Sequence, residues 1–351
     1  MGLNPNLWQG KRVLVTGHTG FKGSWLTLLL KELGADVVGI SLQPQGERSL
    51  YVDAKLGEDL TAEFFQDIRD NEAIEKIIHS SRIDYVFHLA AQALVRRSVM
   101  NPIETITTNV LGTVNVLLPS LSSKNIIGVT IVTTDKVYEN SGLKMAFRES
   151  DKLGGQDPYS SSKAAAELVV SSICLSSNPR HIPVTTVRAG NVIGGGDWAE
   201  NRLVPDIVRA IYANETLFLR NPEATRPWQH VLDCLYGYLL VAQTHFQGMT
   251  DSPKSINFGP EDSVSVTELV GFFEKVFGRK ILTKITKSQI AESSWLSLDS
   301  TLANRYLGWK PSLSSSQAVS QTANWYSQFN AGVNAKRLMK SEISAYRVGK
   351  W

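Results

Sequence analysis

Short apolar runs alternate with longer segments of helical period through the first half of the chain. Successive strand residues face opposite sides, whereas helical residues repeat about every 3.6 positions, so the two patterns separate strands from helices. Strands are predicted at residues 11–16, 36–41, 62–66, 85–89, 127–133 and 184–188, and helices at 20–33, 71–79, 104–121 and 158–174. This alternation is typical of a doubly wound parallel sheet, an α/β fold that binds ligands at the carboxyl ends of its strands.

The pattern changes after about residue 190. It predicts a glycine-rich loop at 191–197, helices at 203–212 and 231–246, strands at 217–220 and 255–258, a polar loop at 221–229, short elements to about residue 329, and a basic tail from Lys336. No linker separates two halves cleanly. We therefore expect a main domain of residues 1–190 and 228–258, interleaved with a smaller α+β lobe of residues 191–227 and 259–351.

The first predicted strand passes into the first predicted helix through a loop with glycines at positions 17, 20 and 23. The N-terminus of a helix offers unpaired backbone N–H groups and a positive dipole end, an arrangement that binds a diphosphate. Gly17 would permit a turn closed to other residues, Gly20 would let the backbone approach the phosphates, and Gly23 would let the helix lie close to the sheet. The context favours a dinucleotide site over an ordinary tight turn.

The end of the second predicted strand bears on which dinucleotide is bound. Ser41 and Leu42 stand where an acidic residue often binds the ribose 2′-hydroxyl of NAD, and no Arg or Lys stands there to bind the 2′-phosphate of NADP. Arg48, further along the chain, is a weak candidate for that phosphate. We therefore expect NAD rather than NADP.

Tyr159 and Lys163 lie four residues apart at the start of a predicted helix, and hence on one face of it. A phenol is normally too weak an acid to act as a base at neutral pH, but a neighbouring ammonium and the positive ring of an oxidised nicotinamide favour its ionised form. Residues 133–138 (TTDKVY) end the fifth predicted strand and would point polar side chains into the same crevice. With the glycine loop, these residues indicate a catalytic site rather than a surface pair.

Composition narrows the possible functions. The 351 residues include 36 Lys and Arg and 33 Asp and Glu, for a formal net charge of +3, too small to indicate binding to nucleic acid or to a membrane. No apolar run approaches the roughly 18 residues of a membrane span, and the start of the chain lacks the apolar core of a signal peptide. The two cysteines have no metal-binding or redox spacing. We expect a cytoplasmic protein without a bound metal.

The chain resembles the extended short-chain dehydrogenases that act on nucleotide sugars, from about residue 8 to residue 329. The residues that carry the resemblance are the three glycines of the loop, residues 89–91, Asn109, Tyr159, Lys163, Arg188 and residues 307–309. More narrowly, WQGKRVLVTGHTGFKGSWL, LAAQALVRRS, TTDKVYEN, RAGNVIGGGDWAENRLVPD and RPWQHVLD resemble the corresponding segments of CDP-glucose 4,6-dehydratases. The dTDP-glucose dehydratases have Asp-Glu where this chain has Asp135 and Lys136, and the 4-epimerases have small residues there.

The resemblance implies a Rossmann-type fold with a substrate lobe, bound NAD and a redox-neutral reaction. CDP-D-glucose would be converted to CDP-4-dehydro-6-deoxy-D-glucose and water, on the way to the 3,6-dideoxyhexoses of surface polysaccharides such as O-antigen. Oxidation of the C4 hydroxyl makes the C5 proton acidic, the C6 hydroxyl leaves, and the stored hydride returns to C6. The resemblance also implies a homodimer, or a higher homo-oligomer, formed through the helices predicted at 104–121 and 158–174.

By the same resemblance, Tyr159 is the base at the C4 hydroxyl, Thr134 hydrogen-bonds that oxygen, and Lys163 tunes the phenol and holds a cofactor ribose. Asp135 is the acid at the C6 hydroxyl, and Lys136 takes the place of the family's glutamate base at C5. A lysine acts as a base only when it is neutral, so its pKa would have to fall well below the free value of about 10.4. Alternatively, it stays charged and stabilises the developing enolate. We prefer the base role and keep both.

The resemblance assigns further residues to binding. The cofactor would be bound at its phosphates by Gly17, Thr19, Gly20, Phe21, Lys22 and Gly23, at its adenine by Asp67 and Ile68, and along its ribose and diphosphate by Leu89, Ala90, Ala91 and Gln92, with Thr108 nearby. The nucleotide sugar would be bound by Thr134, Asn191, Arg202, Leu203, Val204, Arg220, Arg226 and Asn257. Guanidinium groups suit a diphosphate because they donate forked hydrogen bonds.

Three other functions stay open. The chain could be a 4-epimerase on the same scaffold, although such an enzyme needs no acid–base pair after the threonines. It could be a dehydratase of a different nucleotide sugar, because no residue by itself identifies the cytosine ring. It could be a non-catalytic protein that senses a dinucleotide, although such proteins tend to lose the Tyr–Lys pair.

Overall fold

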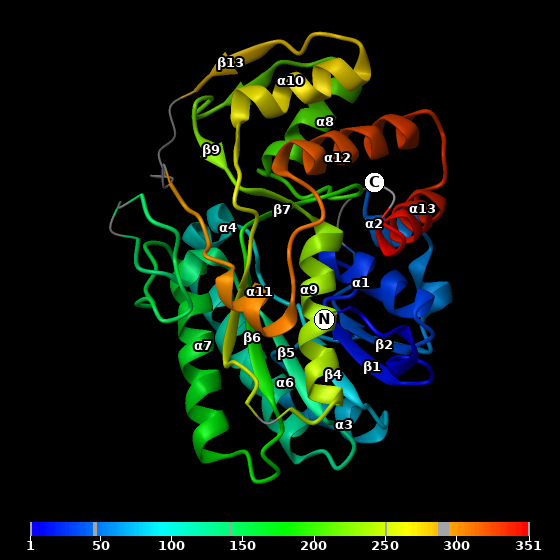
Figure 1. The fold of residues 1–351 in the computed structure, drawn as a ribbon, viewed down its shortest axis with the longest axis vertical. Coiled ribbons are helices and arrows are strands. Elements are labelled where there is room, and N and C mark those ends of the chain that lie inside the picture. The colour runs from blue at the N-terminus through cyan, green and yellow to red at the C-terminus, as the bar shows by residue number, and fades with distance from the viewer. Residues whose placement is uncertain are drawn as a thin grey trace.

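Seven parallel strands form the central sheet (Figure 1). The structure is a computed structural model that describes residues 2–44, 48–140, 142, 144–249, 251–286 and 295–349. In order across the sheet, the strands are β11 (Ser255–Phe258), β6 (Val184–Ala189), β5 (Gly128–Val132), β4 (Tyr85–His88), β1 (Arg12–Thr16), β2 (Asp36–Ser41) and β3 (Ala62–Phe65). The chain runs outward from β1 to β3 and then returns to β4 on the other side of β1. The carboxyl ends of β1 and β4 thus meet at a topological switch point, where such sheets bind ligands.

The predicted strands of this sheet are confirmed. All six that precede residue 190 are present, with ends within one residue of those expected. The strand predicted at 255–258 extends the sheet at its edge, where Ser255 lies opposite Thr186 of β6. The sheet therefore includes a segment that follows part of the lobe in the sequence.

Helices cover both faces of the sheet because side chains alternate along each strand. Leu14 and Val86 belong to the apolar cluster on one face, and their neighbours Val15 and Phe87 belong to the cluster on the other face. The first face is covered by α3 (Asn71–Ser80), α6 (Gly112–Ser122) and α7 (Pro158–Ser176), and the second by α1 (Phe21–Glu32) and α9 (Val231–Phe246).

The helix predicted at 104–121 is interrupted in the structure. It consists of α5 (Pro102–Ile106), a π-helical turn η3 (Thr107–Leu111) and then α6. Asn109 in the π turn is fully buried, and the Thr113 hydroxyl donates to its carbonyl oxygen at 2.7 Å. Turns of this kind are frequent at functional sites, and this one turns the Asn109 side chain toward the site described below.

A smaller lobe lies at one end of the sheet, at the top of Figure 1. The segment predicted as a loop at 221–229 contains two short strands, each paired with a distant segment of the chain. The loop prediction is wrong there. Strands of two or three residues have too few positions to show a periodicity in the sequence. The lobe comprises α8 (Leu203–Ala213), α10 (Val266–Phe277), α12 (Ser315–Asn330) and the pairs β7 (Asn191–Ile193) with β10 (Trp228–His230), β8 (Leu217–Leu219) with β13 (Thr283–Ile285), and β9 (Thr225–Arg226) with β12 (Val264–Ser265). The remaining short elements are η1 (Pro5–Leu7), α2 (Leu50–Asp53), η2 (Leu56–Asp59), α4 (Val95–Met100), η4 (Asp135–Val137) and α11 (Thr301–Leu307).

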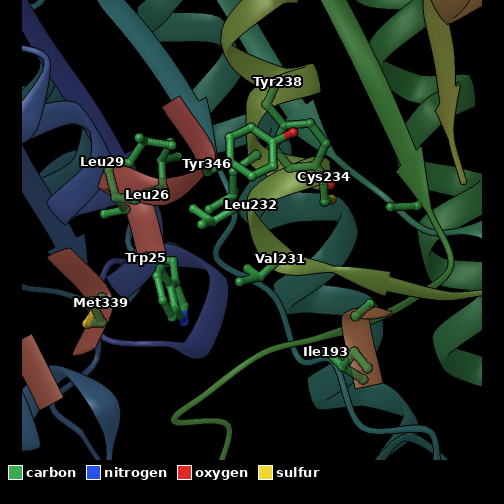
Figure 2. Packing of buried hydrophobic residues seen from close by; sticks show 14 of the residues in the cluster. Trp25, Leu26, Leu29, Ile193, Val231, Leu232, Cys234, Tyr238, Met339 and Tyr346 are labelled. Carbon is green, nitrogen blue, oxygen red and sulfur yellow. The ribbon is translucent and has the colours of Figure 1, made fainter. Parts of the chain in front are cut away.

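The segment expected to be a basic tail is a packed helix, α13 (Ala335–Arg347). Met339 is fully buried, and Figure 2 shows it in the same apolar cluster as Trp25 of α1. The basic residues face outward, where Lys340 pairs with Glu32 at 2.9 Å. The prediction of a basic tail is wrong because it was based on the charged residues. The apolar residues between them have the spacing of a helix with one buried face. The expected lobe range 259–351 therefore includes a helix that packs on the main domain.

None of the helices in the described part of the chain has both the length and the apolar character to cross a bilayer. The described residues also bring together no group of three or more His, Cys, Asp or Glu side chains that could hold a metal ion. Both cysteines, Cys174 and Cys234, are free thiols.

Candidate active site

A cavity of about 600 Å³ is lined by residues of both halves of the molecule. The main domain contributes Lys22 at the start of α1, residues 133–136 after β5 and the first turn of α7. The lobe side contributes residues 191–194 and 202–206. The volume lies within the range of pockets that enclose small-molecule ligands.

The segment after β5 and the start of α7 bring four of the five predicted catalytic residues into the cavity wall. They are Thr134, Asp135, Lys136 and Tyr159. Helix α7 begins here because Asp157 caps its first turn, accepting from the Ser160 N–H at 3.0 Å, and Pro158 occupies the first helical position. The cap sets which side chains of the first turn face the cavity.

Lys163, the fifth predicted catalytic residue, lies one helical turn beyond Tyr159, behind the cavity wall. It is buried, and its ammonium donates to the Val132 carbonyl at 2.9 Å. Burial lowers its pKa to about 8; the positive charge of Lys22 acts in the same direction and Glu167 opposes it. The ammonium therefore fastens α7 to the last residue of β5.

Tyr159 holds its proton near neutral pH in this environment. Burial raises its pKa to about 12, while a hydrogen bond with Thr134 and the positive charge of Arg202 lower it. Thr134 also donates to Asp135 Oδ1 at 2.9 Å. Its hydroxyl therefore lies between the phenol and the carboxyl at the cavity wall. The resemblance named Lys163 as the group that tunes the phenol, which stays a prediction; the cation that lowers the pKa of Tyr159 here is Arg202.

Asp135 has the environment of a general acid. Its side chain is buried, and burial raises its pKa, although neighbouring positive groups, with Lys136 the strongest of them, lower it. A carboxyl that keeps its proton can donate it to a leaving hydroxyl. Lys136 itself is half-buried and lines the cavity beside it.

The glycine loop has the backbone of a dinucleotide site. Gly17 has a φ of +75°, and a Cβ there would lie 2.8 Å from the backbone N of Ala90. A Cβ on Gly23 would lie 2.0 Å from the Gly17 carbonyl oxygen, so this glycine lets α1 lie close to the loop rather than to the sheet. Gly20 is the N-cap of α1 and provides no side-chain cap. The N–H groups of the first turn remain available for a phosphate, so these residues fit the expected dinucleotide.

His88 holds the loop after β4 against the glycine loop. Its two ring nitrogens lie 2.7 Å from Thr16 Oγ1 and 3.0 Å from Thr113 Oγ1, and burial lowers its pKa to about 3. Thr16 Oγ1 also accepts from the N–H groups of Leu89 and Ala90, at 3.1 and 3.2 Å. Two predicted cofactor residues are thus fixed through their backbone at the switch point.

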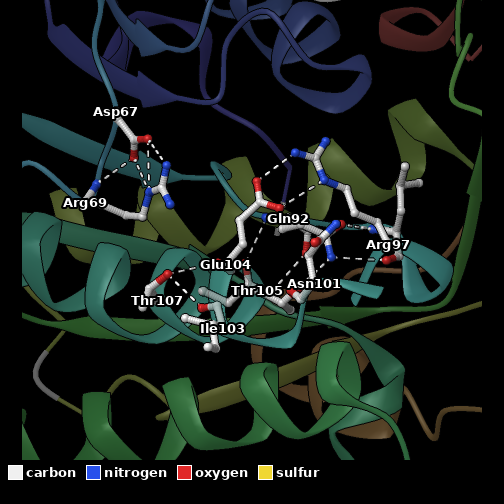
Figure 3. Close-up of polar contacts among 11 residues, drawn as sticks. Asp67, Arg69, Gln92, Arg97, Asn101, Ile103, Glu104, Thr105 and Thr107 are labelled. Carbon is white, nitrogen blue, oxygen red and sulfur yellow. Dashed lines mark hydrogen bonds and ion pairs between the residues drawn. The ribbon is translucent and has the colours of Figure 1, made fainter. Parts of the chain in front are cut away.

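Gln92 links this loop to the helices beside it (Figure 3). Its Nε2 donates to Thr105 Oγ1 at 2.8 Å, and its Oε1 accepts from the Leu94 N–H at 2.6 Å. The Asn109 side chain accepts from the Gln92 N–H at 2.8 Å and donates to its carbonyl at 3.0 Å. Asn109 also donates to Ser162 Oγ at 2.9 Å. The side-chain amide of Asn109 is therefore bonded both to the cofactor loop and to α7, the helix that carries Tyr159.

The other predicted cofactor residues have partners within the protein. The hydroxyl of Thr19 lies 2.7 Å from that of Ser41, Asp67 pairs with Arg69 at 2.6 Å (Figure 3), and the Ile68 side chain is buried. Phe21, Ala91 and Thr108 are half-buried, and Lys22 lines the cavity. Their contacts with a cofactor stay predictions.

Seven of the eight predicted substrate residues line the cavity. They are Thr134, Asn191, Arg202, Leu203, Val204, Arg220 and Arg226. Asn257 is the exception, because it is fully buried and its amide is used inside the protein: Nδ2 donates to the Phe147 carbonyl at 2.9 Å, and Oδ1 accepts from the Tyr138 hydroxyl at 2.8 Å. The structure therefore contradicts its assignment to the substrate.

The cavity also contains residues that the sequence pattern did not single out. Arg96 of α4 donates to Asn201 Oδ1, before α8, at 3.0 Å, and so bridges the main domain and the lobe. Phe218 and Trp228 add apolar surface. The pattern of apolar and polar positions could not identify these residues, because their place in the cavity depends on which distant segment of the chain packs against them.

Comparisons with known proteins identify the family of the chain. The family model described as GDP-mannose 4,6 dehydratase matches residues 14–322. A curated CDP-glucose 4,6-dehydratase from Salmonella typhimurium is 42% identical over 98% of this chain and 98% of its own. The chain belongs to this dehydratase family. The family prediction made from the motifs is confirmed.

More distant relatives include 4-epimerases on the same scaffold. The UDP-glucose 4-epimerase of Erwinia amylovora is 28% identical over 90% of this chain and 98% of its own. The solved UDP-glucose 4-epimerase of Thermotoga maritima has a TM-score of 0.77 and 23% identity and covers 91% of this chain and 99% of that one. The epimerase Mth375 of Methanothermobacter thermautotrophicus has a TM-score of 0.80 and 22% identity over 96% of both chains. These structures confirm the predicted Rossmann-type fold of this dehydratase-family member.

The lowered pKa of Lys163 predicts how stability depends on pH. The amine has a pKa of about 8 in the folded protein against an ordinary value of 10.5. The unfolded chain therefore binds more protons between these values, and the free energy of unfolding rises with pH across that window. Lys163→Met should remove this rise, about 3 kcal/mol.

Urea denaturation at a series of pH values between 8 and 10.5 measures this difference. Lys280→Met, at an exposed side chain, is the control for loss of a lysine at the surface. Parallel pH curves for the unmodified protein and Lys163→Met would contradict the account of the buried amine.

Proposed function

We propose that this protein is an NAD-dependent CDP-glucose 4,6-dehydratase that converts CDP-D-glucose to CDP-4-dehydro-6-deoxy-D-glucose and water. The observation that carries the proposal is the grouping of Tyr159, Thr134 and Asp135 at the cavity wall, where Thr134 bonds Asp135. This grouping supports a base for oxidation at C4 beside an acid for elimination at C6. The CDP-glucose 4,6-dehydratase of Salmonella typhimurium, 42% identical to this chain, supports the choice of substrate.

NAD held at the glycine loop would supply the hydride chemistry of the reaction, taking up the C4 hydride and giving it back at C6, and would be regenerated in each turnover. The uncapped helix start at Gly20 and the close approach at Gly17 are the features that fit its diphosphate. A structural relative, the UDP-glucuronic acid 4-epimerase of Bacillus cereus, was solved with NAD. Arg48, the weak candidate for the 2′-phosphate of NADP, lies over the Trp198 ring, 5.2 Å from its centre.

Tyr159 acts on the C4 hydroxyl. The positive charge of Arg202 and the hydrogen bond with Thr134 lower the pKa of the phenol against the effect of burial. Thr134, whose hydroxyl bonds Asp135 in the structure, would turn to donate to the same sugar oxygen when the sugar is bound. Removal of the O4 proton allows the C4–H bond to give up its hydride, and the resulting ketone acidifies the C5 proton.

Asp135 acts on the C6 hydroxyl. Burial raises its pKa, which favours the protonated carboxyl that could give the leaving hydroxyl the proton it needs to depart as water. The carboxylate that remains is stabilised by Lys136 and Lys22, whose positive charges favour it. The sugar loses two protons, from O4 and C5, and two are supplied, to the leaving hydroxyl and to C5, so the reaction balances.

The substrate diphosphate would lie against the arginines of the lobe. Arg202, Arg220 and Arg226 all line the cavity, and guanidinium groups donate paired hydrogen bonds to phosphate oxygens. Asp197 pairs with Arg202 at 3.0 Å and holds its direction. The choice of cytosine over other bases rests on the curated relative.

Product formation from CDP-, dTDP-, UDP- and GDP-glucose, measured side by side, tests this function. We expect the 4-keto product, detected by its absorbance in alkali, from CDP-glucose with a kcat/KM at least about tenfold above the others. Tyr159→Phe should lower turnover by at least about 100-fold. Tyr212→Phe, which removes a hydroxyl bonded to the Tyr326 carbonyl, is the control.

Each alternative function has its own outcome in this experiment. A C4 epimer without keto sugar would identify an epimerase, and preference for another nucleotide would identify a different dehydratase. No turnover of any of the four sugars would leave a dinucleotide-sensing protein. Each of these results contradicts the proposal.

Lys136 distinguishes two routes for the C5 proton. If it is the base, Lys136→Ala should still oxidise C4 but lose elimination by about 100-fold or more, and Lys136→Glu should keep elimination, because a carboxylate can also take the proton. If it stabilises the enolate by its charge, Lys136→Glu should be as inactive as Lys136→Ala. Product and reduced cofactor are both measured. Unimpaired turnover of Lys136→Ala would remove the residue from the mechanism.

We also propose that the protein is a homodimer through the helices that the resemblance named. Large apolar side chains are exposed along α5, η3, α6 and α7: Ile103, Ile106, Leu111, Leu118, Leu168 and Leu175. Burial of such a face drives association. Leu168→Glu should shift the protein to monomer in sedimentation experiments, and Leu282→Glu, at an exposed leucine of the lobe, should not. A monomeric unmodified protein would contradict the proposal.

The cellular setting completes the proposal. A cytoplasmic location fits the two free thiols, which persist in a reducing compartment. The resemblance to CDP-glucose 4,6-dehydratases supports a role in supplying 3,6-dideoxyhexose precursors of surface polysaccharide.

A further inference from the structure

A buried ion pair lies directly behind the cavity wall. Arg188 of β6 donates from Nε to both carboxylate oxygens of Glu167 on α7, at 2.9 and 3.1 Å, and its Nη2 pairs with the same carboxylate. The two side chains are 3% and 4% exposed. A buried ion pair adds little net stability compared with apolar packing. What matters here is therefore which parts of the chain this pair holds together.

This pair contacts both ends of the catalytic segment, residues 133–138. At the first end, the Thr133 hydroxyl donates to Glu167 Oε1 at 2.6 Å. At the last end, Arg188 Nη1 donates to the Tyr138 hydroxyl at 2.6 Å, and the guanidinium lies 4.8 Å from the centre of the Tyr138 ring. The three catalytic residues of the segment lie between these anchors.

Tyr138 has a further anchor on its other side. Its hydroxyl donates to Asn257 Oδ1 at 2.8 Å, and Asn257 is itself held by its N–H, which donates to Glu149 Oε1 at 2.8 Å. The Tyr138 ring stacks on Phe147 with 4.8 Å between centres. One hydroxyl thus joins Arg188 at the end of β6 to Asn257 at the end of β11, across the end of the catalytic segment.

We propose that the Tyr138 hydroxyl positions the elimination end of the catalytic segment and so holds the Asp135 carboxyl toward the C6 hydroxyl of the sugar. Tyr138 is a positioning residue: its hydroxyl is held by Arg188 and Asn257, and it acts on Asp135 through the backbone of η4. The inference rests on the proposed dehydratase function.

The oxidation end of the site has separate supports. Tyr159 lies on α7, which is capped by Asp157, and Lys163 bonds Val132 before the catalytic segment begins. Asn109 also ties this helix to the cofactor loop through Ser162. Loss of the Tyr138 hydroxyl should therefore leave Tyr159 in place and loosen only the position of Asp135. Elimination at C6 should slow, while oxidation at C4 should keep its rate.

Tyr138→Phe removes only the hydroxyl and keeps the ring that stacks on Phe147. With CDP-glucose, we expect turnover to fall by about 10- to 100-fold, with the rate of cofactor reduction in the first step little changed. Oxidation then outpaces elimination, so the variant should accumulate reduced nicotinamide during turnover, followed by its absorbance in stopped flow. The unmodified protein should accumulate little.

Tyr346→Phe is the matched control, because Tyr346 is a buried tyrosine whose hydroxyl donates to a buried carboxylate, Asp233 Oδ1, at 2.7 Å outside the site. It should turn over like the unmodified protein and show no accumulation of reduced nicotinamide. A loss confined to fold stability would affect both variants alike and would not change the ratio of the two steps.

Two results would overturn the inference: turnover of Tyr138→Phe like that of the control, or equal slowing of cofactor reduction and elimination. Failure of the proposed function looks different. The unmodified protein itself would then form neither keto sugar nor reduced nicotinamide from CDP-glucose, and the inference would fall with it.

Discussion

The junction between the end of β5 and helix α7 is the constraint on which the site depends. Three consecutive residues at the end of β5 each meet one of three side chains on a single face of α7. Val132 accepts from Lys163, Thr133 donates to Glu167, and Thr134 lies beside Tyr159. Because the three helix residues are four positions apart, their side chains lie on the same face of α7, the face that packs against the end of β5. This packing therefore places Tyr159 beside Thr134, and Asp135 follows directly along the chain.

Burial dominates the chemistry of this junction. It raises the pKa of Tyr159 and Asp135 and lowers that of Lys163, so each group is pushed toward its neutral form. A group that acts as an acid must carry its proton, and a group that acts as a base must lose one. Since burial keeps the proton on both Tyr159 and Asp135, burial alone favours only a role as an acid. Arg202 opposes the effect of burial on the pKa of the phenol, and Lys136 opposes it at the carboxyl. Cations therefore favour the ionised form of both groups, which would help the phenol to lose its proton and would stabilise the carboxylate once Asp135 has given up its own.

Apolar periodicity was enough to predict the six main strands and the helices beside them, because buried parallel strands are nearly continuous in apolar residues. Spacing and motif also predicted the glycine loop and the residues that meet in the cavity. The failures depend on tertiary context. Asn257 stands at a strand end like the catalytic residues, but its partners come from distant loops that no local pattern reveals. The pattern equally gave no sign that Arg188 and Glu167 form a pair, since the strand and helix that carry them are predicted separately.

The central claim is that one hydride moves from C4 to C6 of the same sugar within this cavity. CDP-glucose with deuterium at C4, converted in ordinary water and analysed by mass spectrometry and NMR, tests it directly. The account predicts deuterium at C6 of the deoxy sugar and a solvent proton at C5. Deuterium that stays at C4, or is lost to water, would contradict it.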